Sequence, residues 1–307
     1  MGPTLPSGVQ PDYPLARLTT VRTGGTAEFF ARPATADQLV ALLKWASEQG
    51  HEVGVVGSGS NLLVADDGVR GLVMKLDKDL AQIERDGTHL RCGGGARLPA
   101  VSARAANAGL TGIEFGVNIP GTVGGAVRMN ANAYGGELAR ALEHVDVATA
   151  EGVERRTPDT LGFSYRRSNL TPGEIVARAS FQLQPAPVEQ VKSTLADMRA
   201  KRKAAQPSGI KTFGSTFRNP DDPRAEGRTA GQLLDAAGCR GLRVGGAGFS
   251  DKHANFVENN GRASTADVLA LMAAGRRRVY ERFGIVLEPE VQTLGHVAWP
   301  ADWELAA

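Results

Sequence analysis

Three short segments of the chain each place a reactive side chain among loop-forming residues. Arg166 follows Tyr165 near an expected strand, and an arginine in such a place can hold a carboxylate by two parallel hydrogen bonds. Ser215 follows a glycine and stands between aromatic residues, where its hydroxyl can donate a proton if the conjugate base is stabilised. Glu290 has apolar neighbours, and desolvation raises the pKa of a carboxyl group. These residue types support carboxylate binding and acid chemistry.

Each of these residues also has an ordinary structural explanation when it is taken alone. They could be a surface arginine, a serine in a turn and a glutamate at a strand edge. No Gly-x-Ser-x-Gly sequence is present, so acyl-transfer chemistry gains no support. The five histidines show no metal-ligand spacing, which argues against a metal enzyme. We expect His253 to have a structural hydrogen-bonding role.

Glycine is unusually frequent, with 38 residues, and it is clustered in turns. Small residues over 57–62, after an expected strand, can direct backbone N–H groups at a pyrophosphate. This segment is neither a Walker A loop nor a dinucleotide fingerprint, because no Gly-Lys-Ser/Thr follows and Leu62 replaces the third glycine. A second small-residue loop covers 119–126. Two such loops could clasp a dinucleotide, although each could also be a tight structural turn.

The composition is that of an ordinary globular protein of two or three domains. Hydrophobic residues make up 42% and charged residues 22%, and the formal net charge is +2. Nothing global therefore indicates nucleic acid or a membrane surface, and an anionic ligand would need a local basic site. Cys92 and Cys239 form no CxxC pair, and we expect neither a signal peptide nor a transmembrane helix. These features predict a cytoplasmic protein.

Hydrophobic periodicity predicts alternating helices and strands, and hence an α/β or α+β fold. Leu39, Leu42, Leu43 and Ala46 share one face of the first expected helix. The segment 184–187, Gln-Pro-Ala-Pro, is a plausible linker. The expected helices cover residues 36–50, 97–108, 188–204, 229–237 and 264–283, and the expected strands cover 52–56, 62–64, 72–76, 88–92, 143–150 and 174–184.

Seven motifs in this order resemble one family closely, the bacterial flavoenzyme UDP-N-acetylenolpyruvoylglucosamine reductase. The resemblance covers roughly residues 20–295, and seven ordered motifs are very specific. The motifs are TVRTGG (20–25), GSGSNLLVADDGVRG (57–71), IPGTVGGAVRMNANAYGGE (119–137), FSYRRS (163–168), GSTFRNP (214–220), DAAGCRGLRVGGAGFSDKHANFVEN (235–259) and LEPEV (287–291).

The resemblance implies an α+β fold with an FAD-binding PCMH or vanillyl-alcohol-oxidase-type domain of two lobes, followed by a smaller α+β substrate-binding domain. We expect the FAD-binding domain at 1–190, with lobes of about 1–75 and 76–190, and the substrate-binding domain at 191–307. The family implies bound FAD, NADPH as co-substrate and a UDP-sugar enolpyruvyl ether as substrate. A monomer is plausible. The short spacing after FSYRRS resembles the subtype that lacks an extra tyrosine loop.

The resemblance also implies roles for individual residues. Arg166 and Glu290 should stabilise an enolate while Ser215 donates the proton, after hydride has passed from NADPH to FAD and then to the substrate. Glu288 is a nearby competitor, but the family acid directly precedes valine. Two further groups are expected: Gly57, Ser58, Gly59, Ser60, Asn61, Leu62, Pro120, Gly121, Thr122, Gly124, Gly125 and Ala126 bind FAD, and Tyr165, Lys211 and Asn219 bind substrate.

Three positions depart from the family pattern, and two other functions compete. Ser58, Asn118 and Asn132 stand where glycine is common, and asparagine tolerates positive φ best. An oxidase of the same flavin fold would turn over with oxygen and without NADPH. A nucleotide-sugar-binding regulator would be colourless, although the complete set of Arg166, Ser215 and Glu290 argues against it.

Overall fold

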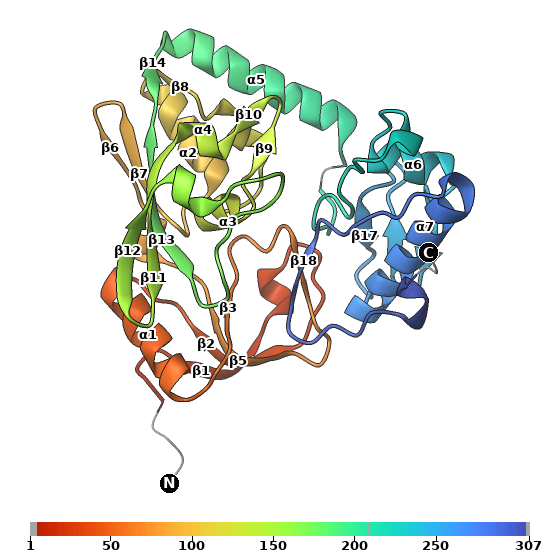
Figure 1. The fold of residues 1–307 in the computed structure, drawn as a ribbon, viewed down its shortest axis with the longest axis horizontal. Helices are drawn as coiled ribbons and strands as arrows, with labels where there is room; N and C mark the ends of the chain where they lie inside the picture. The colour runs from red at the N-terminus through yellow and green to blue at the C-terminus, as the bar shows by residue number, and fades with distance from the viewer. Residues whose placement is uncertain (1–4, 208, 305–307) are drawn as a thin grey trace. The chain divides into compact units, whose positions relative to one another are not determined.

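The computed structural model describes residues 5–207 and 209–304, which form two compact units. Unit 1 consists of residues up to 13 together with 28–58 and 70–202. Unit 2 consists of 14–27, 59–69 and 203 onward. Both units mix helices and strands, so the α+β class is confirmed (Figure 1). No described helix combines the length and apolar character that crossing a membrane requires.

Each predicted helix and strand has a counterpart in the structure, and further elements that were not predicted lie between them. The helices are α1 (Ala36–Glu48), α2 (Leu98–Asn107), α3 (Val123–Arg128), α4 (Leu138–Ala141), α5 (Val188–Ala205), α6 (Ala230–Ala236) and α7 (Thr265–Phe283). The strands are β1 (Gln10–Pro14), β2 (Thr26–Ala31), β3 (Val53–Val55), β4 (Leu62–Val64), β5 (Val69–Met74), β6 (Ile83–Asp86), β7 (His89–Gly93), β8 (Leu110–Thr111), β9 (Asn132–Ala133), β10 (Gly136–Glu137), β11 (Leu142–Thr149), β12 (Gly152–Arg156), β13 (Ile175–Gln182), β14 (Gln184–Pro185), β15 (Arg243–Val244), β16 (Ala247–Phe249), β17 (Val257–Asn259) and β18 (Gln292–Leu294).

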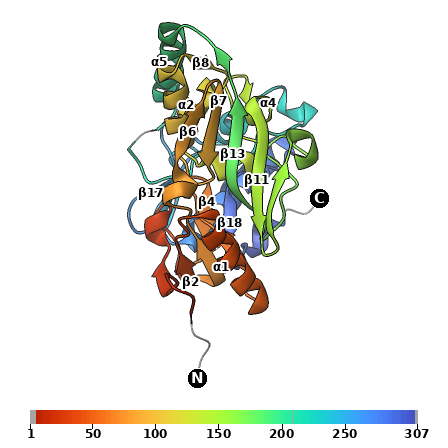
Figure 2. The ribbon, with the colours of Figure 1, turned by 90° about the vertical axis from the view of Figure 1, so that its left-hand side faces the viewer.

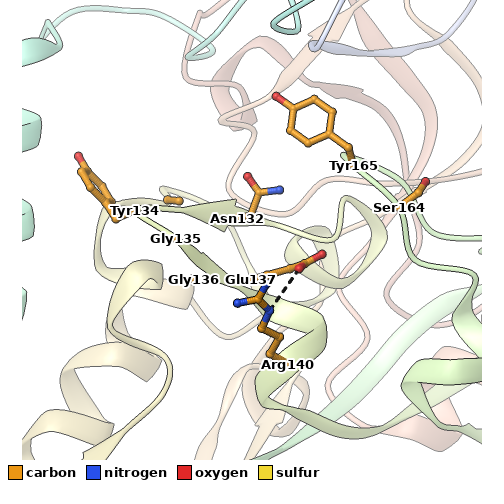
Figure 3. A pocket seen from close by; sticks show the side chains of 9 residues that line it. Asn132, Tyr134, Gly135, Gly136, Glu137, Arg140, Ser164 and Tyr165 are labelled. Atoms are coloured by element: carbon orange, nitrogen blue, oxygen red, sulfur yellow. Dashed lines mark ion pairs between the residues drawn. The ribbon is translucent and has the colours of Figure 1, made fainter. Parts of the chain in front are cut away.

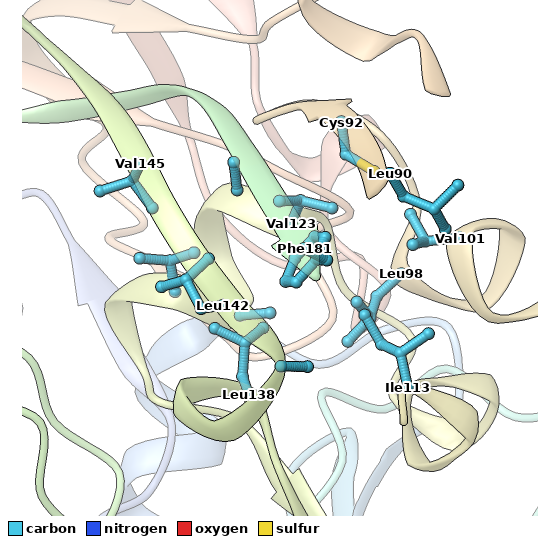
Figure 4. Close-up of a cluster of buried hydrophobic side chains, with 14 of the residues drawn as sticks. Leu90, Cys92, Leu98, Val101, Ile113, Val123, Leu138, Leu142, Val145 and Phe181 are labelled. Carbon is cyan, nitrogen blue, oxygen red and sulfur yellow. The ribbon is translucent and has the colours of Figure 1, made fainter. Parts of the chain in front are cut away.

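An antiparallel five-stranded sheet forms the centre of unit 1, in the order β12-β11-β13-β7-β6 (Figure 2). Its middle strand, β13, is buried almost throughout, as expected of a strand covered on both faces. Side chains from β7, β11 and β13 meet those of α2 and α3 in one apolar cluster, with Phe181 fully buried (Figure 4). This core supports the 119–126 loop, which precedes and begins α3.

Helix α1 packs through the face that its sequence pattern predicts. Thr35 begins it by accepting a hydrogen bond from the Gln38 N–H, a usual helix N-cap. Leu39, Leu42, Leu43 and Ala46 are buried against side chains of β5, β11 and β13. A second sheet has the order β1-β2-β5-β3, and its parallel β3–β5 pair leads the chain into Gly57.

Unit 2 is built around α7. The antiparallel sheet β15-β16-β17 and helix α6 pack against this helix, and strand β18 pairs in parallel with β4. Ser264 caps α7 in a capping box, and the Asp66 carboxylate accepts hydrogen bonds from the Thr265 and Ala266 N–H groups, both at 2.9 Å. An anionic acceptor at a helix N-terminus is stabilising, so an N-terminal segment fixes the start of a C-terminal helix.

The two compact units divide the chain differently from the predicted domains. Segments 14–27 and 59–69 belong to unit 2, although both were expected in the FAD-binding domain. The expected linker at 184–187 contains the short strand β14, which pairs with β8. Proline is tolerated in edge strands, so Pro185 is compatible with this pairing. The units divide after Arg202, within α5. The predicted domain limits at 190 and 191, and the ligand assigned to each domain, stay predictions.

Candidate active site

Arg166 lies at the tip of a tight turn in unit 1. The Ser164 and Arg167 backbones exchange two hydrogen bonds, of 3.1 and 3.2 Å, so Tyr165 and Arg166 form a two-residue turn. Arg166 has φ of 57°, a left-handed conformation that is uncommon for a residue with a side chain. Backbone strain of this kind persists only where the surroundings enforce it, and it is frequent at functional sites.

The Arg166 guanidinium contacts Asn132 in strand β9. Its Nη1 donates to the Asn132 carbonyl oxygen at 3.2 Å and to the Asn132 side-chain Oδ1 at 3.0 Å. Its Cζ also lies 5.3 Å from the centre of the Tyr165 ring. Asn132 therefore restricts the direction of the guanidinium through both its backbone and its side chain.

A buried asparagine ties this turn to the neighbouring hairpin. The Asn130 side chain donates to the Glu137 carboxylate at 2.6 Å and to the Ser164 carbonyl at 3.2 Å, and it accepts from the Ala139 N–H. Asn130 is fully buried and has φ of 38°. The sequence reasoning did not single it out, although a polar side chain in the Met129–Ala131 stretch was a usable signal.

The same elements line a pocket of about 370 Å³ (Figure 3). The rings of Tyr134 and Tyr165 stand on either side of Asn132, and these two residues are 46% and 49% exposed. Glu137 and Arg140 form an ion pair of 3.6 Å beside them. The pocket thus offers exposed aromatic surface, hydrogen-bonding groups and paired charges. The lining residues are Asn132, Ala133, Tyr134, Gly135, Gly136, Glu137, Arg140, Ser164 and Tyr165.

Ser215 and Glu290 lie on neighbouring backbone segments of unit 2. Phe217 pairs with Pro289, and the Glu290 N–H donates to the Thr216 carbonyl at 2.8 Å. Ser215 is paired on its other side with Phe256. The structure therefore pairs the backbone segments that carry two of the three predicted reacting residues, while Arg166 belongs to unit 1.

Two asparagines hold these segments of unit 2. Asn255 forms a pair of hydrogen bonds with the Phe217 backbone, accepting at 2.9 Å and donating at 2.8 Å, and its carbonyl accepts from the Thr216 N–H. Asn61 donates its amide to the Glu290 carbonyl at 3.2 Å. Asn61 was predicted to bind FAD, and this role stays a prediction. The hydrogen bond to Glu290 is a structural contact that the sequence did not indicate. The signal for Asn255 was a buried polar residue within HANF.

The predicted substrate residues of unit 2 occupy structural positions. The Asn219 side chain accepts from the Ala230 N–H at 3.1 Å, near the start of α6. The Lys211 carbonyl accepts from the Asn259 N–H at 2.9 Å, and the Lys211 side chain is exposed. His253 accepts from the Asn255 N–H through Nδ1, and burial lowers the pKa of His253. This agrees with the predicted hydrogen-bonding role of His253.

In unit 1 the two predicted cofactor loops meet. A Cβ added to Gly57 would lie 2.5 Å from the Thr122 hydroxyl, so only glycine allows this approach. The Thr122 hydroxyl accepts from the Gly125 N–H at 3.5 Å, while the Gly124 N–H donates to the Gly94 carbonyl at 2.8 Å. The same requirement holds in unit 2, where a Cβ on Gly59 would lie 2.0 Å from the Leu18 carbonyl oxygen.

The donors in these loops suit a phosphate-bearing cofactor. The N–H groups of Gly57, Ser58 and Thr122 donate no hydrogen bond within the described ranges. Backbone N–H groups require a partner when they are covered, and successive ones bind phosphate well. A Cβ on Gly121 or Gly125 would make only ordinary van der Waals contacts, at 3.9 and 3.6 Å, so the packing at these two glycines is not tight. The loops therefore fit the diphosphate of FAD.

The three departures from the family pattern keep the backbone in ordinary conformations. Ser58, Asn118 and Asn132 all lie outside the left-handed region, so the tolerance of asparagine for positive φ is not what these positions require. Asn118 instead donates to the Met198 carbonyl at 2.7 Å, and Asn132 accepts from Arg166. Both asparagines make side-chain contacts that glycine lacks.

Comparison with known proteins identifies both parts of the chain. Residues 27–157 match the FAD binding domain, and residues 206–294 match the C-terminal domain of UDP-N-acetylenolpyruvoylglucosamine reductase. The reductase of Anaeromyxobacter dehalogenans (strain 2CP-C) is 45% identical over 96% of this chain and 87% of the relative. Reductase 2 of Symbiobacterium thermophilum is 42% identical, over 96% of this chain and 94% of the relative.

A solved structure agrees with these relatives over the whole fold. The reductase from Thermus caldophilus superposes with a TM-score of 0.80 and 39% identity, covering 95% of this chain and 99% of that chain. The predicted family, the predicted pairing of an FAD-binding domain with a second domain, and the predicted flavin cofactor are confirmed. The chain belongs to the family of UDP-N-acetylenolpyruvoylglucosamine reductases, flavin-dependent oxidoreductases of peptidoglycan precursor synthesis.

Proposed function

We propose that this enzyme uses NADPH and FAD to reduce UDP-N-acetylglucosamine enolpyruvate to UDP-N-acetylmuramate, with Arg166, Ser215 and Glu290 as its reacting residues. The observation that carries the assignment of residues is the backbone pairing of the Ser215 and Glu290 segments, fixed by the 2.8 Å bond from the Glu290 N–H to the Thr216 carbonyl. Family membership supplies the reaction class. The cytoplasmic location expected from the sequence belongs to the same proposal.

Ser215 delivers the proton that completes the reduction. Hydride addition to the methylene carbon leaves negative charge on the carbon beside the carboxylate, and that carbon then needs a proton. A serine hydroxyl is a weak acid, so its donation requires neighbours that stabilise the developing charges. The hydrogen bonds of Phe217 and Thr216 to Asn255 fix the backbone next to Ser215, from which the hydroxyl projects.

Arg166 and Glu290 stabilise the enolate. The Arg166 guanidinium is a fixed positive charge with several donors, suited to a carboxylate or enolate oxygen. The contacts to Asn132 and Tyr165 hold it before substrate arrives, and preorganised charge needs little rearrangement during reaction. Glu290 is held at its backbone by Thr216 on one side and by Asn61 on the other.

The cofactor loops bind FAD, which supplies the hydride-transfer chemistry when bound. Gly57, Ser58 and Thr122 offer their N–H groups to its diphosphate. Glycine at 57 allows the two loops of unit 1 to make contact, because a Cβ at this position would lie 2.5 Å from the Thr122 hydroxyl. Tyr165, in the wall of the pocket of unit 1, and Lys211 and Asn219 in unit 2 are proposed to contact substrate.

The Ser215→Ala variant tests the proton-donor role. Flavin reduction by NADPH should stay at the wild-type rate, while reoxidation by the enolpyruvyl UDP-sugar should slow by roughly 100-fold or more. Rapid-scan absorbance measures both half-reactions in one sample, and Ser215→Cys, which keeps a proton donor, should recover part of the lost rate. Normal turnover of Ser215→Ala would exclude the role. Turnover by oxygen without NADPH would instead indicate an oxidase.

A further inference from the structure

Lys75 lies beside the FAD loops at the end of strand β5. Its Nζ donates a hydrogen bond to the Gly57 carbonyl, and its backbone N–H donates to the Ala31 carbonyl at 3.1 Å. The ammonium group therefore sits against the loop whose Gly57 and Ser58 N–H groups have no acceptor among the described residues. In the sequence, Lys75 lies within the expected strand 72–76 and has no assigned role.

Two arginines accompany Lys75. Arg32 follows directly on the Ala31 carbonyl that Lys75 contacts, and Arg97 pairs through its backbone with Thr122, the residue that meets Gly57. Within the described ranges none of these three cations forms an ion pair. We name Arg32, Lys75 and Arg97 the basic cluster.

Positive charges that lie close together repel one another, and a bound anion offsets this repulsion. Burial, Arg32 and Arg97 lower the pKa of Lys75, and Asp77 opposes them only in part. The positive charge is thus disfavoured in the protein without ligand, and a bound anion would reverse that penalty. The adjacent N–H groups also favour an anion. Phosphate oxygens satisfy both groups of donors at once.

We propose that the basic cluster binds the diphosphate of FAD, with Lys75 as its central contact. This site supplies the local positive charge that an almost neutral chain needs for a dianionic ligand. The inference deepens the FAD assignment and rests on it. Lys75 has no part in the proton transfer or in stabilising the enolate.

Flavin binding to flavin-stripped protein tests the proposal. Lys75→Met keeps the apolar stem and removes the charge, and it should weaken FAD binding by roughly 10- to 100-fold, the range of one charge-assisted hydrogen bond. Riboflavin has no phosphate, so its affinity should be the same for Lys75→Met and wild type. Quenching of flavin fluorescence on titration measures both constants. Lys75→Arg should retain most of the FAD affinity.

Controls separate a phosphate contact from a structural one. Lys44→Met removes an exposed lysine of α1 that lies 4.0 Å from Glu48, and it should leave both affinities unchanged. Added NaCl should weaken FAD binding to wild type more steeply than to Lys75→Met, because salt screens the removed charge. The unfolding temperature of flavin-stripped Lys75→Met should equal or exceed that of wild type, since a disfavoured charge is gone.

Each outcome decides the proposal. Equal FAD affinity in wild type and Lys75→Met overturns the role of Lys75 while FAD binding by the enzyme stands. A parallel loss of riboflavin and FAD affinity, with a lower unfolding temperature, shows that Lys75 only supports the loop and likewise overturns it. Wild-type protein that binds neither flavin overturns the FAD assignment together with the inference.

Discussion

Arg166→Gly should relieve the backbone strain at this position, whereas Arg166→Ala should keep it. Both variants should impair catalysis to the same extent. Both variants remove the guanidinium and its two bonds to Asn132. They differ because residue 166 has φ of 57°, where a Cβ costs about 1–2 kcal/mol and glycine costs nothing. Glycine also makes the unfolded chain more flexible, which costs about 0.4–1 kcal/mol. Arg166→Gly should therefore be more stable than Arg166→Ala by about 0.5–1 kcal/mol.

Urea unfolding followed by circular dichroism measures this difference, and residue 167 provides the control. Arg167 is exposed, adjacent to Arg166, and outside the left-handed region. At that position glycine should be less stable than alanine by about 0.5–1 kcal/mol, so the sign reverses between neighbours. Both variants at 166 should slow substrate-driven reoxidation of flavin by a similar factor, while flavin reduction by NADPH continues.

Arg166→Ala as stable as Arg166→Gly, or more stable, would refute the left-handed backbone and with it the link between strain and function. Equal losses in both half-reactions would show instead that the variants lose FAD or fold poorly. If glycine restores stability but not the rate of flavin reoxidation, the strained backbone at Arg166 is explained by the function of its side chain.

Three further substitutions test polar side chains of unit 2. Thr216→Val should raise the free energy of unfolding by about 1 kcal/mol, because the Thr216 hydroxyl is buried and has no hydrogen-bond partner in the described structure; calorimetry that shows destabilisation would contradict this. Asp66→Ala should lower that free energy by about 1–2 kcal/mol through loss of two bonds at the start of α7, and an unchanged urea midpoint would exclude the cap. Burial, followed by Arg240, lowers the pKa of His253, so its neutral form stabilises the fold above pH 6.5 and this stability is lost as pH falls through the folded pKa. Replacing His253 by glutamine should reduce the change of the urea midpoint between pH 8 and 5.5. The same replacement at the exposed His296 should leave this pH dependence as it is in the wild type.

Elements with a repeating pattern were predictable from the sequence, and α1 shows why. Four apolar residues at helical spacing, with threonine before them, specify one buried face and one start, and the structure has both. Helix α7 was expected over 264–283 and is found at Thr265–Phe283, with Ser264 as its cap. Local sequence determines such features because the contacts involved lie within one or two turns.

The pairing of the Ser215 and Glu290 segments could not be predicted in this way. A single isolated bridge, between Phe217 and Pro289, joins the two segments, and neither has the alternation that marks a regular strand. Their register depends on Asn255 and Asn61, which come from distant parts of the chain. The identity of the reacting residues was inferred from ordered motifs and stays a prediction. The proposed role of Lys75 could not be predicted from the sequence. It depends on Arg32 and Arg97, which lie far from Lys75 in the sequence and act on its charge only in the folded protein.

The interleaved path of the chain has a consequence for synthesis and for dissection of the protein. The chain passes between the two units five times, so unit 2 is assembled from three separate segments. A fragment beginning at residue 203 would lack β4, the partner of β18, and Asp66, which caps α7. During translation, residues 14–27 and 59–69 emerge long before the segments that they pack against. We therefore expect unit 2 to form only after nearly the whole polypeptide has left the ribosome, and complementation by co-expressed fragments to succeed where the isolated C-terminal fragment fails.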